Sequence, residues 1–145
     1  MARPAVFLDT SIFITALLST KGGSFYILNT FKDRADFQTS EYVFAEIDEV
    51  LKHKFFGRID MRTKLFLILG TTNVTVLPNR PKREVMRLKK YISEKDAPIL
   101  ASALKESDYL LTLDNEFFND KIMRLASNKR LSILKPKDFI EIFRK

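Results

Sequence analysis

Four acidic residues spread along the chain could together hold a divalent cation. Asp9 and Asp114 each follow an apolar run directly, and Glu46 and Asp96 lie between them in the sequence. A cluster of carboxylates repels both itself and phosphate, so it requires cations, and ligation by oxygen alone selects hard ions such as Mg²⁺ or Mn²⁺. These ions bind phosphodiesters and lower the pKa of an attacking water. The four acids therefore suggest metal-dependent hydrolysis of a phosphodiester.

Glu46 lies inside the apolar stripe of an expected helix. It comes three residues after Val43 and four before Val50, so it shares their face of the helix. A carboxylate that faces a core is costly unless something pairs with it. A structural alternative stays open, in which Glu46 reaches outward from the core boundary or pairs with Arg or Lys.

Each of the three Asp residues also has a purely structural interpretation, as a helix N-cap. Asp is a favoured cap, and a helical pattern follows Asp9 and Asp114. At Asp96 the pattern Ser93-x-x-Asp96 matches a capping box, but a helix capped by Ser93 would contain Pro98 beyond its first turn. We therefore expect the helix to begin at Asp96, with Pro98 in the first turn. Capping alone could still explain these acids.

The composition limits the chemistry further. The 145 residues include no Cys and one His, which excludes disulfides, thiolate nucleophiles, iron-sulfur clusters and sites with sulfur or several His ligands. The 25 Lys and Arg residues exceed the 18 Asp and Glu residues, and the net charge of +7 makes a polyanion a plausible partner. Local acid within a basic chain is the charge arrangement expected of a metal-dependent nuclease.

Strand and helix patterns alternate along the whole chain. Apolar or β-branched runs predict strands at 5–8, 73–77, 109–113 and 131–134, and a further short strand is expected at 36–39. Helical periodicity and capping residues predict helices at 11–18, from 25 onward, and at 40–54, 58–69, 81–92, 96–107, 116–127 and 136–143. This alternation predicts one α/β domain over 1–145, with a parallel sheet between two layers of helices, because parallel strands need crossovers. Ligands bind such sheets beyond the carboxyl ends of the strands, where Asp9 and Asp114 should meet. Phe7, Phe66 and Phe139 fit core positions.

Four motifs, in this order and at this spacing, resemble those of the PIN domain family. They are Val6-Phe7-Leu8-Asp9-Thr10-Ser11, Ser40-x5-Glu46-x3-Val50-Leu51, Asp96-Ala97-Pro98-Ile99-Leu100 and Tyr109-Leu110-Leu111-Thr112-Leu113-Asp114. The resemblance covers nearly the whole chain and is closest to the stand-alone prokaryotic PIN proteins presumed to be toxins of toxin-antitoxin pairs. It implies a Rossmann-like three-layer α/β/α fold with four to five parallel strands. It also implies Mg²⁺ or Mn²⁺ dependence and RNA endonuclease activity.

The resemblance assigns roles to individual residues of the chain. Its metal-binding and catalytic acids would be Asp9, Glu46, Asp96 and Asp114, with Glu116 as a further acid that could act through water, and Thr10, Ser11 and Thr112 in support. Two positions depart from the family pattern. Ser11 stands where many members have Asn, which bears on the orientation of Asp9, and Leu113 replaces a small residue. The family further implies an antitoxin partner and a homodimer formed through helices.

A second group of residues could bind nucleic acid. Arg83, Arg87 and Lys90 follow one another at helical spacing, so they would form one positive face. This face could follow the phosphate backbone of an RNA. It could equally be an ordinary solvated helix surface.

Two other functions are alternatives to the endoribonuclease. A phosphatase of the haloacid dehalogenase kind also begins with a strand that ends in Asp, but it needs a second Asp two residues later, where this chain has Ser11. The non-catalytic alternative is a nucleic-acid-binding or partner-binding module whose acids serve as caps. No apolar run approaches the ~20 residues that span a bilayer, and no signal sequence is apparent, so we expect a cytoplasmic protein without membrane contact.

Overall fold

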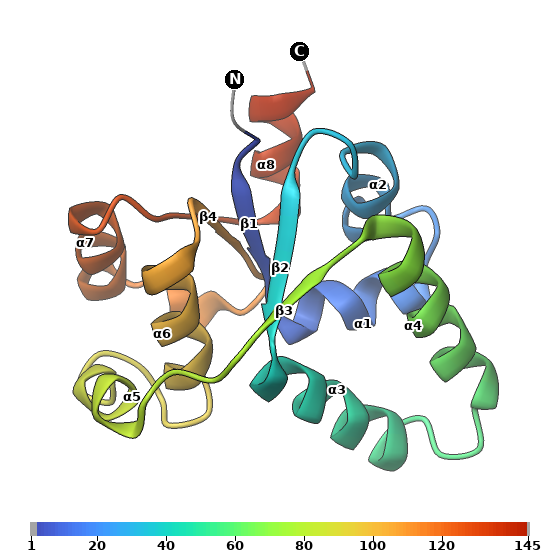
Figure 1. The fold of residues 1–145 in the computed structure, drawn as a ribbon, viewed down its shortest axis with the longest axis horizontal. Coiled ribbons are helices and arrows are strands. Elements are labelled where there is room, and N and C mark those ends of the chain that lie inside the picture. The colour runs from blue at the N-terminus through green and yellow to red at the C-terminus, as the bar shows by residue number, and fades with distance from the viewer. Residues whose placement is uncertain (1–2, 145) are drawn as a thin grey trace.

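A five-stranded parallel sheet forms the centre of the molecule (Figure 1). The computed structural model describes residues 3–144. The strands are β1 (Ala5–Leu8), β2 (Asp36–Ser40), β3 (Thr75–Leu77), β4 (Tyr109–Leu111) and β5 (Ser132–Leu134). Their order across the sheet is β3-β2-β1-β4-β5, and every neighbouring pair is parallel. The predicted parallel α/β sheet is confirmed.

Helices cover both faces of this sheet and complete a three-layer α/β/α fold. They are α1 (Thr10–Leu18), α2 (Gly23–Thr30), α3 (Glu41–His53), α4 (Ile59–Thr72), α5 (Lys82–Leu88), α6 (Ala97–Glu106), α7 (Asp120–Asn128) and α8 (Pro136–Phe143), with a short 3₁₀ helix at Asn115–Phe118. Helices α1 to α4 lie on one side of the sheet and α5 to α7 on the other (Figure 1). Helix α8 packs against α2 and β5.

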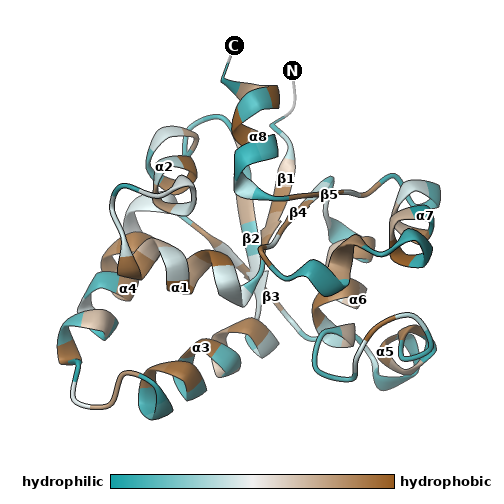
Figure 2. Cartoon of the chain, turned by 180° about the vertical axis from the view of Figure 1, so that it is seen from behind, coloured by the Kyte–Doolittle hydropathy of each residue, from teal (hydrophilic) through white to brown (hydrophobic). Residues whose placement is uncertain are grey.

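The central strands β1 and β4 are apolar without alternation because both of their faces are covered. Val6, Phe7 and Leu8 of β1 are fully buried, as is Leu110 of β4. Figure 2 shows apolar residues along the central strands and alternating apolar and polar residues along α3. The core therefore lies on both sides of β1 and β4.

The register of the strands brings several chain segments out at one edge. Leu8 pairs with Leu111 at the carboxyl ends of β1 and β4, and Ser40 pairs with Leu77 at those of β2 and β3. The side chain of Ser40 caps α3 by accepting a hydrogen bond from the Val43 backbone N–H. The residues that follow β1, β2 and β4 therefore start from the same edge of the sheet, which is the edge where ligands bind in such folds.

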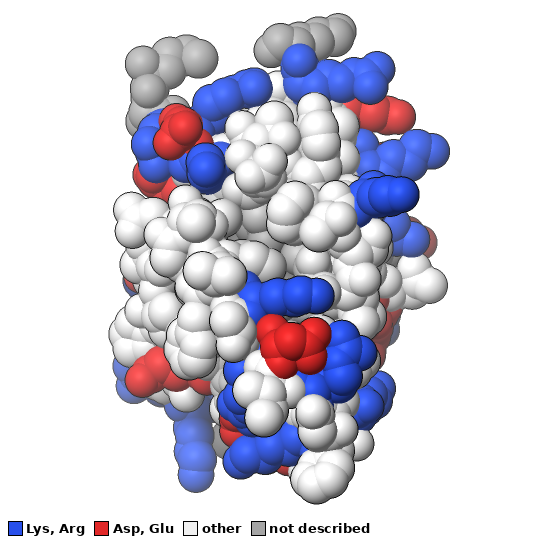
Figure 3. Space-filling model, turned by 90° about the vertical axis from the view of Figure 1, so that its right-hand side faces the viewer, with Lys and Arg blue, Asp and Glu red and all other residues white. Residues whose placement is uncertain are grey.

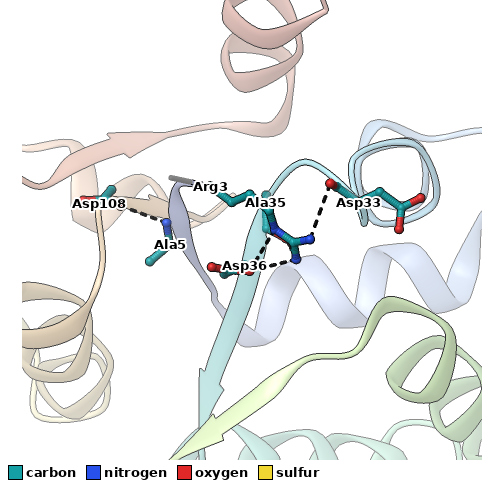
Figure 4. Close-up of polar contacts among 6 residues, drawn as sticks. All are labelled: Arg3, Ala5, Asp33, Ala35, Asp36 and Asp108. Atoms are coloured by element: carbon teal, nitrogen blue, oxygen red, sulfur yellow. Dashed lines mark hydrogen bonds and ion pairs between the residues drawn. The ribbon is translucent and has the colours of Figure 1, made fainter. Parts of the chain in front are cut away.

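Acidic residues at the opposite edge, where β1, β2 and β4 begin, make structural hydrogen bonds. Figure 4 shows Arg3 donating to the Asp36 carboxylate over 3.0 Å and to the Ala35 carbonyl oxygen over 3.3 Å. The Asp108 carboxylate accepts from the Ala5 N–H over 2.8 Å, which joins the starts of β1 and β4. Acids at this edge fasten strand ends together.

Several expectations for individual segments and residues were wrong. The strand at 109–113 ends at Leu111, so the residues leading to Asp114 lie beyond the sheet. The segment 116–127 is divided into a 3₁₀ helix and α7 because Asn119 caps α7 through the Ile122 N–H. Phe66 is 71% exposed on the outer face of α4, because Met61 and Ile68 of that helix face the core instead.

No single helix within residues 3–144 is long and apolar enough to cross a membrane. Helices α1 and α2 reach that length and apolar content only together, across a bend of 97°. Residues of both belong to the core, so their apolar composition serves internal packing.

Candidate active site

A cleft of about 830 Å³ lies at the carboxyl edge of the sheet. Its lining includes six of the eight predicted active-site residues, Asp9, Thr10, Ser11, Glu46, Asp96 and Asp114, but neither Thr112 nor Glu116. They come from the end of β1 and the start of α1, from α3, from the start of α6 and from the segment after β4. The fold thus collects acids that are far apart in the sequence into one cleft.

Three of the acids form a tight cluster. One carboxylate oxygen from each of Asp96, Asp114 and Glu116 lies within 4.8 Å of the others, and Asp96 is only 5% exposed. The Asp114 carboxylate accepts from the Glu116 N–H over 3.0 Å, which fixes the turn that carries both acids. Ser93 completes the cluster by donating its N–H to Glu116 and its hydroxyl to Asp96 over 3.3 Å.

Thr112 connects Asp9 to this cluster. Its buried hydroxyl donates to Asp9 Oδ2 over 2.6 Å and accepts from the Asp114 N–H over 3.0 Å. Ser11 makes a parallel link, donating to Asp9 Oδ2 over 3.2 Å and accepting from the Leu113 N–H over 3.1 Å. Two hydroxyls therefore tie the end of β1 to the segment after β4.

Glu46 is held by Thr10. The Thr10 hydroxyl donates to Glu46 Oε1 over 2.6 Å, while the Thr10 N–H donates to Asp9 Oδ1 over 2.6 Å. One residue therefore orients two acids from different elements. The partner of Glu46 is a hydroxyl and not Arg or Lys, which explains how a carboxylate is accommodated inside the apolar stripe of α3.

Burial and nearby negative charge raise the pKa values of Asp96 and Asp9. The pKa of Asp96 is raised to about 8, mainly by burial and in addition by the neighbouring Asp114, Glu116 and Asp9. Burial likewise raises the pKa of Asp9 to about 6, although the hydrogen bond from Thr112 opposes this effect. Ionised acids are therefore costly in this cleft unless positive charge accompanies them.

The family model of the PIN domain matches residues 6–121. The chain belongs to the PIN domain family.

Two solved structures show how closely this PIN domain shares its fold with others. The crystal structure of VapBC2 from Rickettsia felis, bound to a DNA fragment from their promoter, aligns with a TM-score of 0.69 and 18% identity over 90% of this chain and 98% of that chain. The structure of PAE2754 from Pyrobaculum aerophilum aligns with a TM-score of 0.66 and 18% identity over 97% of both chains. A search of curated protein sequences finds no significant match.

The three-acid cluster of this PIN domain suits a hard divalent cation. Oxygens bound to one Mg²⁺ at 2.0–2.1 Å lie about 2.9 Å apart when adjacent and about 4.1 Å apart when opposite. The oxygens of Asp96, Asp114 and Glu116 already lie within 4.8 Å, so small side-chain rotations would bring them to these separations. The donor set is oxygen alone, as Mg²⁺ and Mn²⁺ prefer. Asp9 and Glu46 line the same cleft, but their carboxylates are occupied by hydroxyl donors.

The capping interpretation applies to two of the three Asp residues. Asp9 and Asp114 accept N–H hydrogen bonds from the turns that follow them, so each combines a capping contact with a place in the cleft. Asp96 stands at the N-cap position of α6 but makes no capping hydrogen bond. Its carboxylate is turned toward Ser93 and the other acids, so capping does not explain Asp96.

The predicted positive helix face of this PIN domain is incomplete. Helix α5 ends at Leu88, where the chain turns back through a hydrogen bond from the Tyr91 N–H to the Leu88 carbonyl oxygen. Lys90 therefore lies beyond the helix, with its Nζ 5.4 Å from the centre of the Tyr91 ring. Arg87 and Lys90 still meet in a pocket between α5, α6 and α7, whereas Arg83 does not line it.

Two polar residues that were not predicted from the sequence, Tyr42 and Lys95, also line the cleft. Tyr42 lies one helical turn before Glu46, and burial together with Glu46 raises its pKa to about 12, so it stays a neutral hydroxyl. It donates to the Lys95 carbonyl oxygen over 2.7 Å and fixes the loop before Asp96. The spacing of four between Tyr42 and Glu46 was the available signal. Lys95 also lines the cleft, but nothing in its local sequence marks it.

Removing divalent cations should make the stability of this PIN domain depend on pH with a definite sign. The Asp96 pKa is about 8 in the folded chain and ordinarily 3.8, so between these values the folded state binds more protons than the unfolded state. The free energy of unfolding should therefore fall as pH rises through this window. Added Mg²⁺ should raise the melting temperature more at pH 8 than at pH 6, since fewer protons must be displaced.

Thermal melts with and without Mg²⁺ across this pH range measure the effect. Asp96→Asn is the matched control, because it removes the titrating group while keeping the side-chain shape. Equal melting curves for both proteins at every pH would contradict the assignment of the effect to Asp96.

Proposed function

We propose that this PIN domain is a divalent-metal-dependent endoribonuclease that hydrolyses phosphodiester bonds of single-stranded RNA. The observation that carries the proposal is the cluster of Asp96, Asp114 and Glu116, two of which line the same cleft as Asp9 and Glu46. Membership of a nuclease family supports hydrolysis. The net charge of +7 supports a polyanionic substrate.

Each acid has a defined part in this proposal. Asp96, Asp114 and Glu116 would hold the Mg²⁺ or Mn²⁺ ion, which when bound activates water and stabilises charge on the phosphate. Asp9 and Glu46 are kept at the cleft wall by Thr112 and Thr10, where they add negative charge next to the cluster. The ammonium groups of Lys54 and Lys95, which also line the cleft, can compensate the charge of an entering phosphate.

Cleavage of a mixed-sequence single-stranded RNA by the purified protein tests the proposal. We expect cutting with Mn²⁺ and with Mg²⁺, no cutting with chelator, and fragments with 5′-phosphate and 3′-hydroxyl ends, because water is the attacking group. A single-stranded DNA of the same sequence, incubated in parallel, distinguishes ribonuclease from general nuclease activity. Mass spectrometry of the fragments identifies the ends.

Two results would count against the proposal. Fragments with cyclic phosphate ends would show that a ribose hydroxyl and not water attacks. Absence of cutting together with absence of any Mg²⁺ effect on the melting temperature would favour the binding module, whose acids serve as caps. The phosphatase alternative has no structural support, because Ser11 positions Asp9 and offers no second carboxylate.

The proposal includes an antitoxin as protein partner and a homodimer of the PIN domain. The VapBC2 structure, to which this chain is similar in fold, is that of a toxin-antitoxin pair, which supports an antitoxin partner.

An apolar surface supports the homodimer. Figure 3 shows the side of the molecule that carries α2 and α4, with a broad area free of charged side chains. Ile59, Phe66 and Leu67 of α4 are 79%, 71% and 62% exposed, and apolar exposure of this extent typically marks a protein interface. Light scattering of the protein alone, and after co-expression with the product of a neighbouring gene, measures both assemblies.

A further inference from the structure

A second cavity lies directly beside the acidic cleft. It has a volume of about 600 Å³ and is formed by the turn between α1 and α2 and by the start of α8. Thr15 and Leu113 line both cavities, and Leu113 immediately precedes Asp114. A chain that lies across the three-acid cluster can therefore continue past Leu113 into this cavity, which we call the α8 pocket.

The charge of the α8 pocket is opposite to that of the cleft. Lys135, Lys137 and Arg144 line it, against one acid, Glu141. Lys135 is already held in place, since its Nζ donates to Asn115 Oδ1 over 3.0 Å and lies 5.4 Å from the centre of the Phe118 ring. Because Asn115 follows Asp114, the positive charge of Lys135 is fixed relative to the three-acid cluster.

The backbone around the α8 pocket adds to its preference for anions. Helices α2 and α8 both begin there, and neither start has a side-chain cap, so N–H groups at both ends remain available for other acceptors. Gly23 permits this arrangement, because a Cβ atom at that position would come within 3.3 Å of Pro136 Cβ. Small residues on the α1–α2 turn, Ser19 and Gly22, leave the cavity open.

We propose that the α8 pocket binds a backbone phosphate of the RNA strand adjacent to the scissile phosphate. This inference rests on the proposed function and adds the path of the substrate. Fixed cations and backbone N–H groups position nucleic acid through its phosphates, and they do so without regard to sequence. The strand then runs from the acids, past Leu113, onto Lys135 and Lys137.

The basic pocket between α5, α6 and α7 is a less suitable path. Arg87, Lys90, Lys105 and Lys129 line it, so its charge is comparable. It shares no lining residue with the acidic cleft, however, whereas the α8 pocket shares two. Because the α8 pocket adjoins the cleft, its positive charge can bind the same RNA strand that lies at the acids.

Binding of a labelled single-stranded RNA of about 12 nucleotides tests the inference. The Asp96→Asn protein serves as background, so that the RNA stays intact, and fluorescence anisotropy measures the dissociation constant over a range of salt concentrations. Adding Lys135→Ala and Lys137→Ala should weaken binding about tenfold. The slope of log affinity against log salt should become shallower by about 1.4, the value for two lost phosphate contacts on a single strand.

Two further double variants distinguish binding in the α8 pocket from general electrostatic attraction and from a local structural change caused by losing the Lys135–Asn115 contact. Lys121→Ala with Arg124→Ala removes the same charge from exposed positions of α7 that line neither the cleft nor the α8 pocket, and it should change binding by less than about twofold. Lys137→Ala with Arg144→Ala leaves the Lys135 contact to Asn115 intact and should match the first pair. An equal loss in the α7 pair, or no loss in either pocket pair, overturns the inference.

Cleavage by proteins with intact Asp96 separates this inference from the proposed function. One outcome is that the unchanged chain cuts RNA with metal while the pocket variants bind and cut like the α7 control. This outcome would support the nuclease and contradict the subsite. RNA binding that depends on the α8 pocket, without cutting under any metal condition, would support the subsite and contradict the nuclease. Failure to bind RNA at all would overturn the subsite.

Discussion

Replacing Asp96 with Asn is expected to slow metal-dependent RNA cleavage by about 10²-fold or more. Asp96 is the most buried of the three clustered acids, and Asn would offer one neutral oxygen where the ion needs a charged one. Single-turnover cleavage rates at saturating Mn²⁺ measure the loss. Asp114→Asn should produce a loss of the same order, and the double variant should lose little more, because both acids serve one ion.

Stability distinguishes a lost ligand from a misfolded protein. In the absence of metal, Asp96→Asn should melt at a higher temperature than the unchanged chain at pH 8, because it no longer has to ionise a buried carboxyl group. It should also lose the stabilisation by Mg²⁺. Asp120→Asn, an exposed acid in the first turn of α7, is the matched control and should retain its cleavage rate. An Asp96→Asn protein that cuts at the original rate would refute the site.

Replacing Thr112 with Val should destabilise the protein by about 1–3 kcal/mol and also reduce cleavage. Val keeps the shape of the fully buried Thr112, but it removes the donor to Asp9 Oδ2 and the acceptor of the Asp114 N–H. The hydrogen bond from Thr112 is the strongest influence that lowers the Asp9 pKa, so this pKa should rise above about 6. Urea unfolding and the pH dependence of cleavage measure the two effects.

Thr112→Ser provides the corresponding rescue. It retains the hydroxyl, so it should restore the pH dependence of cleavage even if the missing methyl group costs some stability. A Val variant whose cleavage has the original pH dependence would show that Thr112 contributes to folding alone. Ser11→Ala should have a smaller effect, because the Ser11 contact to Asp9 is longer, 3.2 Å against 2.6 Å, and Thr112 remains in place.

These predictions depend on one arrangement of charge. The chain concentrates carboxylates where β1, β4 and α6 meet, while its excess of basic residues lies elsewhere, including the α8 pocket. The raised pKa values of Asp96 and Asp9 favour their protonated forms, and a bound cation would favour the ionised forms. Burial and repulsion by neighbouring acids raise the pKa of Asp96, and a divalent ion would offset both effects.

Much of the fold could be predicted because its signals are local. Apolar or β-branched runs marked the strands other than β2, and Ser40, Asp96 and Pro98 marked helix starts that the structure contains. Connection rules then required a parallel sheet, and that sheet placed Asp9 and the segment after β4 at one edge. The helix at 81–92 was overextended because the turn after Leu88 depends on packing of the loop that follows.

The sequence alone determined the elements, the parallel sheet and the edge at which the acids gather, since periodicity and chain connection fix these features. Only the tertiary structure decided which acids lie within reach of one ion, because a distance between side chains depends on strand register and on how three helices pack. It placed Glu116 with Asp96 and Asp114, and it assigned Asp9 and Glu46 to hydroxyl partners. It also exposed Phe66 and formed the α8 pocket from segments more than a hundred residues apart. Neither feature can be predicted from a local sequence pattern, because both depend on how distant segments pack.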